Sequence, residues 1–276
     1  MTWFTEKHTP HAGITLELGK TLFDEKSPFQ HVEVVETIEY GRMLLLDGCV
    51  MVTDRDEFVY HEMITHPALL AHPRPERVLI IGGGDGGSVR EALKHPEARS
   101  IELVEIDGMV IDASRRFFPA LTVGLDDPRV TVRVADGFAH LDNHPGAYDV
   151  ILVDSMDPVG EAAKLFTTPF FRKVKAALRP GGIAVFQSES PFYHADILRD
   201  LVLAMRQTFA HAAPYVAHIP TYPSGLWSFT FASDAIDPLT ATPRAGGPWL
   251  AGLKYFHPAL FRAAFVLPNY FRTKLL

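Results

Sequence analysis

The sequence contains little cysteine, no long apolar run and no excess of basic residues. Its 276 residues include a single cysteine, Cys49, so an internal disulfide is impossible and a reducing compartment is expected. No apolar stretch reaches the ~18 residues that a membrane span needs. The first residues lack the basic segment and apolar core of a signal peptide. We therefore expect a cytoplasmic protein that does not insert into a membrane.

The charge balance is mildly acidic. Lys and Arg number 26 and Asp and Glu number 33, which gives a formal net charge of −7. Nucleic acid is therefore not expected as a partner, because phosphate binding needs a basic surface. The negative charge permits a cationic ligand, but it is equally consistent with ordinary solubility. With 47% hydrophobic and 21% charged residues, the chain has the composition of a folded globular protein.

The first part of the chain has the pattern of β-strands. Apolar and polar residues alternate over 14–18 and again from Val32 to Tyr40, which indicates strands with one buried face. Asp47-Gly48 separates the apolar runs 43–46 and 49–52, and this pairing of strands with an Asp-Gly turn predicts a hairpin. We expect residues 1–54 to form a small antiparallel β domain.

From Asp56 onward the pattern changes to alternating helices and strands. A helix is expected from Asp56 to the prolines near position 73, and another over 170–178. The predicted strands are 78–81, 101–104, 130–134, 149–153, 183–186 and two more within 214–232, followed by a surface loop over 233–247. Such alternation predicts an α/β domain over 55–276, a Rossmann-like, methyltransferase-type fold with a mostly parallel sheet.

A glycine cluster follows the first strand of this domain. Residues 82–87 (GGGDGG) contain the GxGxxG pattern that places a helix N-terminus and a close-approaching backbone against a nucleotide. Glu105 ends the next strand, where an acid can bind ribose hydroxyls. The combination predicts a nucleoside site. The alternative is a glycine-rich turn that serves only helix–sheet packing.

Asp85 within the glycine cluster narrows the choice of nucleoside. Its carboxylate would repel a pyrophosphate, whereas it suits a ligand with a free ammonium and no carboxylate, such as decarboxylated S-adenosylmethionine. It could instead complement the dipole of the following helix. Asp136 and Gly137 follow the third strand, where a carboxylate can accept a hydrogen bond from the adenine amine. Asp136 could also simply cap a helix that begins at Phe138.

Two carboxylates, Asp154 and Asp157, end the fourth strand, where open α/β sheets bind their ligands. They suit a cationic co-substrate, and one of them could accept the proton that an alkylamine (pKa near the ~10.4 of Lys) must lose before it attacks. An Asp-Pro loop with an Asx-turn is the structural alternative. Tyr60 and His61 lie at the junction of the two domains, where they could serve packing or chemistry.

No metal site is expected. His140 and His144 lie four residues apart, but the sequence offers no third ligand beside them. Cys49 has no basic neighbour in sequence that would lower its pKa, so we interpret it as a packing residue of its strand.

Four motifs in order carry a family resemblance. They are DEFVYHEM at 56–63, LIIGGGDGG at 79–87, VDSMDPVG at 153–160 and IPTYPSG at 219–225. Together they resemble spermidine synthases of the polyamine aminopropyltransferase family. The similarity runs from WFTE at 3–6 to AFVLP at 264–268, and DGCVM at 47–51 points to the Bacillus-type branch.

The resemblance implies that the aminopropyl group of decarboxylated S-adenosylmethionine is transferred to putrescine, giving spermidine and 5′-methylthioadenosine. Decarboxylated S-adenosylmethionine is then a co-substrate and no cofactor is expected. Members of the family often form dimers or tetramers through their N-terminal strands, so a homodimer or homotetramer is implied.

Matching motifs also imply residue roles. Asp154 would be the catalytic proton acceptor. The implied binding residues are Gln30 and Glu105 for the sugar, Asp136 and Gly137 for adenine, His61 and Asp85 for the aminopropyl amine, and Tyr60, Asp154, Asp157 and Tyr222 for the diamine, with Glu189 as a further candidate at its far end.

One departure from the family pattern concerns the acceptor. Glu161 stands where most relatives have proline, and some relatives that act on agmatine-type amines also carry Gly-Glu there. Tyr222 and the PSG that follows it favour putrescine, with agmatine and cadaverine left open.

The other candidate functions are an S-adenosylmethionine-dependent amine N-methyltransferase, an NAD-dependent dehydrogenase and a non-catalytic polyamine- or nucleoside-binding module.

Overall fold

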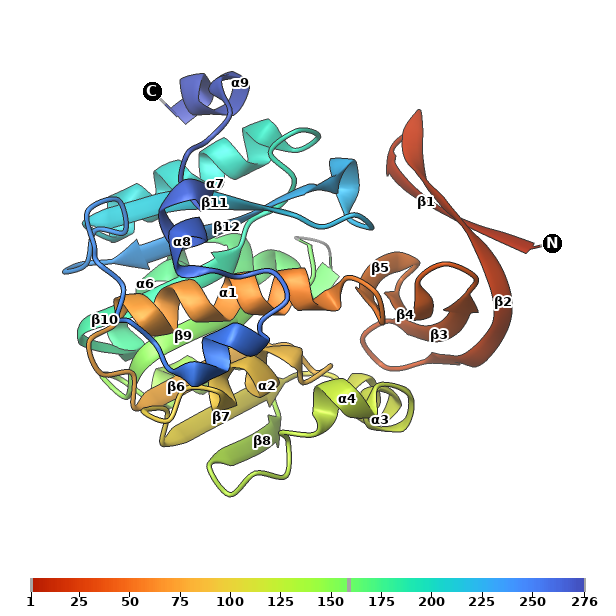
Figure 1. Ribbon diagram of the computed structural model, residues 1–276, viewed down its shortest axis with the longest axis horizontal. Helices are drawn as coiled ribbons and strands as arrows, with labels where there is room; N and C mark the ends of the chain where they lie inside the picture. The colour runs from red at the N-terminus through yellow and green to blue at the C-terminus, as the bar shows by residue number, and fades with distance from the viewer. Residues whose placement is uncertain (1, 158–159, 276) are drawn as a thin grey trace.

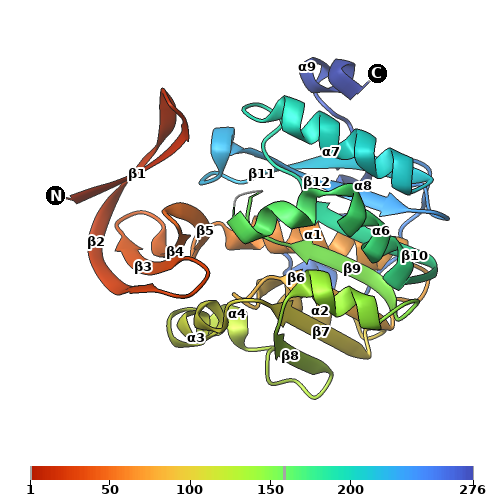
Figure 2. The ribbon, with the colours of Figure 1, turned by 180° about the vertical axis from the view of Figure 1, so that it is seen from behind.

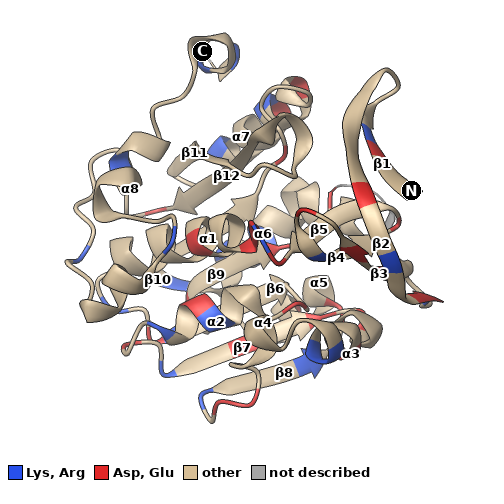
Figure 3. Ribbon diagram, turned by 45° about the vertical axis from the view of Figure 1, so that its right-hand side comes forward, with Lys and Arg blue, Asp and Glu red and all other residues tan. Residues whose placement is uncertain are grey.

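The computed structural model describes residues 2–157 and 160–275, and it consists of two sheets of different size. A five-stranded sheet formed by the N-terminal residues lies beside a seven-stranded sheet that carries most of the helices (Figure 1). Acidic and basic residues are interspersed over both parts (Figure 3). No helix within the described residues is long and apolar enough to cross a membrane.

The N-terminal sheet is antiparallel throughout, in chain order. Its strands are β1 (Thr2–Thr9), β2 (Ala12–Lys26), β3 (His31–Thr37), β4 (Gly41–Leu46) and β5 (Cys49–Thr53). The β1–β2 hairpin extends away from the rest of the molecule in both views (Figures 1 and 2). Asp47 and Gly48 both have positive φ, of 50° and 78°, as a two-residue hairpin turn requires, which confirms the predicted hairpin.

The strand expected to reach Tyr40 ends earlier, at Thr37. The Thr37 hydroxyl donates to the carbonyl of Gly41 and accepts from the amide of Tyr40, so it closes a turn over residues that alternate like a strand. Gly41 supplies the positive φ of 71° at this turn. The alternating pattern alone did not reveal the reversal because the turn is held by a side chain.

The larger sheet has the order β11-β12-β10-β9-β6-β7-β8. Its strands are β6 (Arg77–Gly82), β7 (Ser100–Glu105), β8 (Val130–Val134), β9 (Tyr148–Asp154), β10 (Leu178–Gln187), β11 (His211–His218) and β12 (Leu226–Ser233). The five strands from β8 to β10 are parallel, whereas β12 is antiparallel to both of its neighbours. The expected mostly parallel, Rossmann-like sheet with a small antiparallel N-terminal sheet is confirmed.

Helices cover both faces of the larger sheet. They are α1 (Glu57–Ala71), α2 (Gly87–Leu93), α3 (Gly108–Phe117), α4 (Pro119–Thr122), α5 (Gly137–His140), α6 (Thr168–Ala177), α7 (Ala195–Thr208), α8 (Pro258–Ala264) and α9 (Asn269–Arg272). The 3-10 turns are η1 (Leu141–Asn143), η2 (Gly160–Phe166), η3 (Pro223–Gly225), η4 (Pro248–Gly252) and η5 (Thr273–Leu275). α1, α2 and α8 cover one face (Figure 1), and α6 and α7 cover the other (Figure 2).

Strand β6 shows why the sheet needs both layers. Val78 and Ile80 are buried against the α1 side, and Leu79 and Ile81 are buried against the α6 side. Each such side chain contributes roughly 1.5–3 kcal/mol by leaving water. The unbroken apolar run is therefore the sequence mark of a central strand that is covered on both faces.

A third packing layer joins the two sheets. Val110 of α3 and Phe118, which precedes α4, pack against Val34 and Leu44 of the N-terminal sheet. This contact places β4 and β5 opposite the carboxyl ends of the parallel strands, where the candidate site lies.

Candidate functional site

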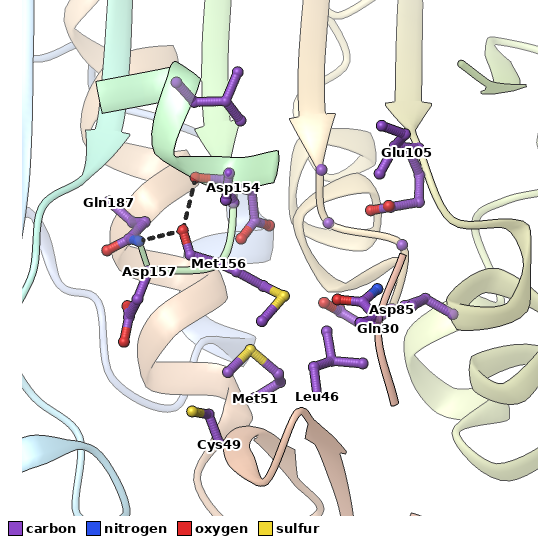
Figure 4. A pocket seen from close by; sticks show the side chains of 18 of the residues that line it. Gln30, Leu46, Cys49, Met51, Asp85, Glu105, Asp154, Met156, Asp157 and Gln187 are labelled. Carbon is purple, nitrogen blue, oxygen red and sulfur yellow. Dashed lines mark hydrogen bonds between the residues drawn. The ribbon is translucent and has the colours of Figure 1, made fainter. Parts of the chain in front are cut away.

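A cavity of about 320 Å³ lies between the N-terminal sheet and the carboxyl ends of the parallel strands. Leu46, Cys49 and Met51 from the N-terminal sheet line the side that faces Asp85 and Asp154 (Figure 4). Its volume is at the lower end of the range typical of small-molecule sites. Every binding residue predicted from sequence lines this cavity except Glu189.

The glycine cluster is required by a close approach between β6 and β9. Gly82 and Gly83 have positive φ, of 82° and 66°, and the Gly83 amide donates to the Asp154 carbonyl over 2.8 Å. A Cβ at Gly82 would lie 2.1 Å from that carbonyl oxygen. One loop thus combines packing between strands with a backbone that lines the cavity.

Asp107, the residue that caps α3, connects Gln30 with Glu105 by hydrogen bonds. Gln30 Nε2 donates to Asp107 Oδ2 over 2.8 Å, and the Asp107 amide donates to Glu105 Oε1 over 2.9 Å. Burial raises the pKa of Glu105 to about 7. Carboxylate and amide oxygens that are fixed in this way can accept hydrogen bonds from the two hydroxyls of a ribose.

Asp136 caps a helix, as one of its two expected roles requires, and its expected contact with adenine stays a prediction. It caps α5 by accepting from the Phe138 amide over 2.8 Å, and it also lines the cavity. Its Oδ2 accepts from Nζ of Lys164 over 2.9 Å. At Gly137 a Cβ would lie 2.4 Å from Ile81 Cγ2, so glycine is needed for this approach to the sheet.

Asp85 and His61 form an ion pair. His61 is 2% exposed, and its Nε2 lies 3.0 Å from Asp85 Oδ1 while its Nδ1 lies 2.7 Å from Oε2 of Glu57. Burial disfavours a charged ring, but Asp85 and Glu57 outweigh it and raise the pKa of His61 to about 10. Burial likewise works against the Asp85 carboxylate, and His61 reverses this, so that the Asp85 pKa is lowered.

Asp154 ends β9 and is 9% exposed. The Tyr60 hydroxyl donates to its Oδ1 over 2.7 Å, and the Ser88 hydroxyl donates to its Oδ2 over 2.5 Å. Burial, followed by repulsion from Asp85, raises the pKa of Asp154 to about 6. A carboxylate with a pKa closer to neutrality is a better proton acceptor than an ordinary aspartate.

Asp157 lies beyond Asp154 in the same cavity (Figure 4). Burial, followed by repulsion from Glu189, raises its pKa to about 7. Glu189 itself does not line the cavity, because its carboxylate turns to Nδ1 of His194, 2.6 Å away. It influences Asp157 through charge, and its expected contact with a diamine stays a prediction.

Tyr222 reaches the cavity from the segment before η3. Its hydroxyl donates to the Met51 carbonyl over 2.7 Å, and its ring packs against those of Tyr60 and Trp227. Tyr222 therefore joins the larger sheet to β5. Its aromatic ring forms part of the wall beside Asp154.

Glu6 is a cavity residue that the sequence analysis missed. It lies on β1, accepts from the Val50 amide over 2.9 Å, and has its pKa raised to about 7 by burial. The WFTE segment at 3–6 carried the only signal, as part of the family resemblance. Cys49 also faces the cavity, in addition to packing in its strand, and burial raises the pKa of its thiol to about 11.

Three groups among the described residues have ligand atoms close enough to share a metal ion. They are Glu102 with His140 and His144, Asp24 with His31 and Glu33, and His61 with Asp85 and Asp154. The reasoning that His140 and His144 lack a third partner was therefore wrong, because β7 brings Glu102 beside them. Glu102 is already engaged by Arg133 and by the Tyr148 hydroxyl. The absence of a metal stays a prediction.

Pro158 and the side chain of Glu161 fall outside the described part of the chain. The expected Asp-Pro loop and the departure from the family pattern at Glu161 thus lie outside the described residues. Asp157 is the last described residue before this gap.

The fold and cavity define a class of protein. The glycine loop and the acid that ends β7 lie beside other carboxylates that line the cavity. They lie at the carboxyl ends of the parallel strands. This arrangement is that of an α/β transferase for a nucleoside donor and a cationic acceptor.

Comparison with known proteins identifies the family. A model described as the spermine/spermidine synthase domain matches residues 57–241, and one described as the spermidine synthase tetramerisation domain matches residues 2–54. The chain therefore belongs to the spermine/spermidine synthase family, and its activity is that of an aminopropyltransferase.

Individual relatives agree over nearly the whole chain. Polyamine aminopropyltransferases of Shouchella clausii and Bacillus subtilis are both 47% identical, covering 99% and 97% of this chain and 98% and 96% of their own lengths. A spermidine synthase solved in complex with the transition-state analogue AdoDATO superposes with a TM-score of 0.94 at 35% identity, covering 99% of this chain and 94% of its own. Spermidine synthase from Thermotoga maritima superposes with a TM-score of 0.92 at 35% identity, covering 100% and 94%.

Proposed function

We propose that this chain transfers the aminopropyl group of decarboxylated S-adenosylmethionine to putrescine. In the reaction an amine nitrogen of putrescine attacks the aminopropyl carbon that is bonded to the sulfonium sulfur. A C–N bond forms and the C–S bond breaks, and the bonding electrons stay on sulfur, which leaves as the neutral thioether 5′-methylthioadenosine. The nitrogen releases one proton, so that the other product is spermidine.

The opposed environments of Asp85 and Asp154 support this proposal most directly. The two carboxylates have atoms within 4.8 Å of the same His61 ring, yet the pKa of one is lowered and that of the other is raised to about 6. A carboxylate held in its charged form suits the protonated aminopropyl amine, and a less acidic neighbour suits proton transfer. We assign the first role to Asp85 and the second to Asp154.

The leaving group needs little help, because a sulfonium becomes a neutral thioether as it departs. Catalysis then depends on alignment of the two substrates and on removal of the acceptor's proton. Tyr60 and Ser88 fix both oxygens of Asp154, which limits the orientations that the carboxylate can take. Tyr222 would guide the alkyl chain of the diamine along the wall that it forms with Tyr60.

The remaining residues divide between the two parts of the donor nucleoside. Gln30 and Glu105 would hold the ribose, and Asp136 with Gly137 would meet the adenine. Lys164, paired with Asp136, must share or yield that carboxylate when a nucleobase amine arrives.

The distal amine of the acceptor would bind near Asp157. Asp157, Glu6 and Glu189 interact electrostatically, and burial raises the pKa values of Asp157 and Glu6 to about 7. A second ammonium would relieve the repulsion among these acids. This favours a diamine over a monoamine as the acceptor.

The proposal also covers the oligomeric state, the domain boundary and the cellular location of the protein. We take residues 1–54 and 55–276 as the two domains, and a homodimer or homotetramer as the working form. Analytical ultracentrifugation of the full chain distinguishes these states. The cytoplasmic location and the lack of a nucleic-acid partner, both expected from composition, stay predictions.

A product assay tests the proposed reaction. The enzyme is incubated with decarboxylated S-adenosylmethionine and, separately, putrescine, cadaverine or agmatine, and products are separated by mass. Spermidine formed at the highest kcat/KM supports the proposal. A parallel reaction with S-adenosylmethionine and putrescine tests the alternative activity, N-methylation. Methylputrescine as the main product would mean that the chain is an N-methyltransferase and not an aminopropyltransferase for putrescine.

A further inference from the structure

His61, which is buried, is part of a chain of alternating charges that continues beyond the cavity through half-buried side chains. From the cavity outward the order is Asp85, His61, Glu57 and Arg90. Arg90 binds Glu57 with two nitrogens, over 2.8 and 3.0 Å, and its Nε donates to Glu91 over 2.8 Å. Glu57 and Arg90 do not line the cavity, so substrate contact cannot account for this arrangement.

The geometry determines the protonation of His61. Both ring nitrogens face carboxylate oxygens, Nδ1 toward Glu57 at 2.7 Å and Nε2 toward Asp85 at 3.0 Å. An ionised carboxylate can only accept, so each nitrogen must carry a hydrogen. A neutral ring would direct one lone pair at a carboxylate oxygen. The ring is also fixed in place, since a Cβ at Gly87 would lie 2.3 Å from it.

An imidazolium cannot accept a hydrogen bond from an ammonium. The contact of His61 with the aminopropyl amine that the family resemblance implies stays a prediction, and this geometry favours an action through Asp85 instead. Asp85 Oδ1 already receives His61 Nε2 and the Gly87 amide at 2.7 Å, which leaves Oδ2 as the acceptor for a ligand. The function of the ring is to orient and charge-balance Asp85.

We propose that Glu57 is a positioning residue for the transfer reaction: its carboxylate, held by Arg90, keeps His61 as a cation, and that cation holds Asp85 ready for the aminopropyl ammonium. The inference deepens the site of the proposed function and rests on it. Glu57 acts through His61 and touches neither substrate.

The cation has a second effect, on the proton acceptor. The charged and titratable groups around the ring are Glu57 and Tyr60 on its own helix, Asp85 in the glycine loop, Arg90 on α2 behind Glu57, and Asp154 on β9. The positive ring lowers the pKa of Asp154 and so offsets part of the increase caused by burial and Asp85. Loss of the ring charge would raise the Asp154 pKa further and reduce the fraction of Asp154 that can accept a proton at neutral pH.

Substitution Glu57→Gln tests the proposal, with histidine NMR as the first measurement. In the ligand-free protein labelled with ¹⁵N-histidine, His61 is assigned by the resonance that His61→Asn removes. The wild-type ring is expected to stay doubly protonated from pH 6 to 9, and the Glu57→Gln ring is expected to lose a proton within that range. A singly protonated wild-type ring at pH 7.5 would overturn the proposal.

Kinetics provide the second measurement. The acidic limb of kcat/KM for decarboxylated S-adenosylmethionine is expected to move up by about 1–3 pH units in Glu57→Gln, because an opposite charge at this range shifts a carboxyl pKa by that amount. Glu57→Asp keeps the charge and should restore the limb in part. An unmoved limb in a folded Glu57→Gln enzyme would contradict the proposal.

Glu62→Gln is a matched control on the same helix. The Glu62 carboxylate is buried and accepts from the backbone amides of Lys254, Tyr255 and Phe256, over 2.7–2.9 Å. This variant should lose stability without moving the acidic limb, so it separates a structural effect from a positioning one. Failure of the proposed reaction would appear differently, as absence of product from the wild type, while the NMR measurement stays informative.

Discussion

The Asp85 side of the cavity and the Asp154 side contain similar carboxylates in different surroundings. Asp85 contacts a buried imidazolium and a backbone amide, and the resulting attraction lowers its pKa. Asp154 contacts two neutral hydroxyls, and Asp157 beyond it faces other acids, so burial dominates and the pKa values rise to about 6 and 7. Side chains and backbone of α1 and α2, rather than residue type, thus give the two carboxylates opposite pKa shifts.

Substitution Asp154→Asn should have the largest effect, because it removes the proposed proton acceptor and keeps the shape of the side chain. We expect kcat at pH 7.5 to fall about 10²–10⁴-fold, the usual range for loss of general-base catalysis. Steady-state product formation measures kcat, and thermal unfolding checks that the variant is folded. A decrease of less than threefold would remove Asp154 from this role.

Asp85→Asn should affect the donor most. Loss of one charge-assisted hydrogen bond, about 1.5–3 kcal/mol, corresponds to a roughly 10–150-fold rise in KM for decarboxylated S-adenosylmethionine. Repulsion from Asp85 raises the Asp154 pKa, so the acidic limb of kcat/KM should move to lower pH than its wild-type position near 6. Glu57→Gln moves that limb the opposite way, and equal directions in the two variants would argue against the charge model.

Asp157→Asn should raise KM for putrescine about tenfold and leave KM for the donor within about threefold, as expected for one charged contact with the distal amine. The two Michaelis constants are measured by varying each substrate in turn. If the donor constant rises instead, the distal amine does not bind at Asp157.

The same variant should be more stable than the wild type at alkaline pH when no substrate is bound. The folded Asp157 carboxyl has a pKa of about 7 against an ordinary pKa of 3.8, so its contribution to stability is present below about pH 4 and is lost as pH rises through 7. Asparagine removes this loss. Each ~1 kcal/mol regained would raise Tm at pH 8 by roughly 2–4 °C, and the gain should disappear near pH 4.

Cys49→Ala should have the smallest effect. The thiol has a pKa of about 11, so it is uncharged at neutral pH and offers no charge to an ammonium. We expect kcat/KM for putrescine to stay within about threefold of the wild type. A tenfold loss would indicate that the thiol sets the shape of the acceptor end of the cavity.

The local sequence pattern was sufficient to predict a structural feature wherever one short segment contains all the residues that determine it. The Asp47-Gly48 hairpin, the buried strand at 78–81 and the glycine cluster depend on backbone conformation and burial of neighbouring residues, so their sequences predict them. Two features depend instead on side-chain contacts, which the hydrophobic periodicity does not reveal. They are the turn closed by Thr37 and the position of Glu102 beside His140 and His144.

By itself the sequence determined the fold class, the family and the set of acids that gather at the carboxyl ends of the parallel strands. The fold class follows from the alternation of strands and helices. The family and the set of acids follow from motifs whose residue spacing determines the local backbone conformation. Only the tertiary structure decided what each acid can do. It placed Glu57, Asp85 and Asp154 around His61, brought Glu6 across from the N-terminal sheet, and turned Glu189 toward His194. The physical reason is that a carboxyl pKa depends on charges and burial supplied by residues distant in the chain, and folding alone brings these together.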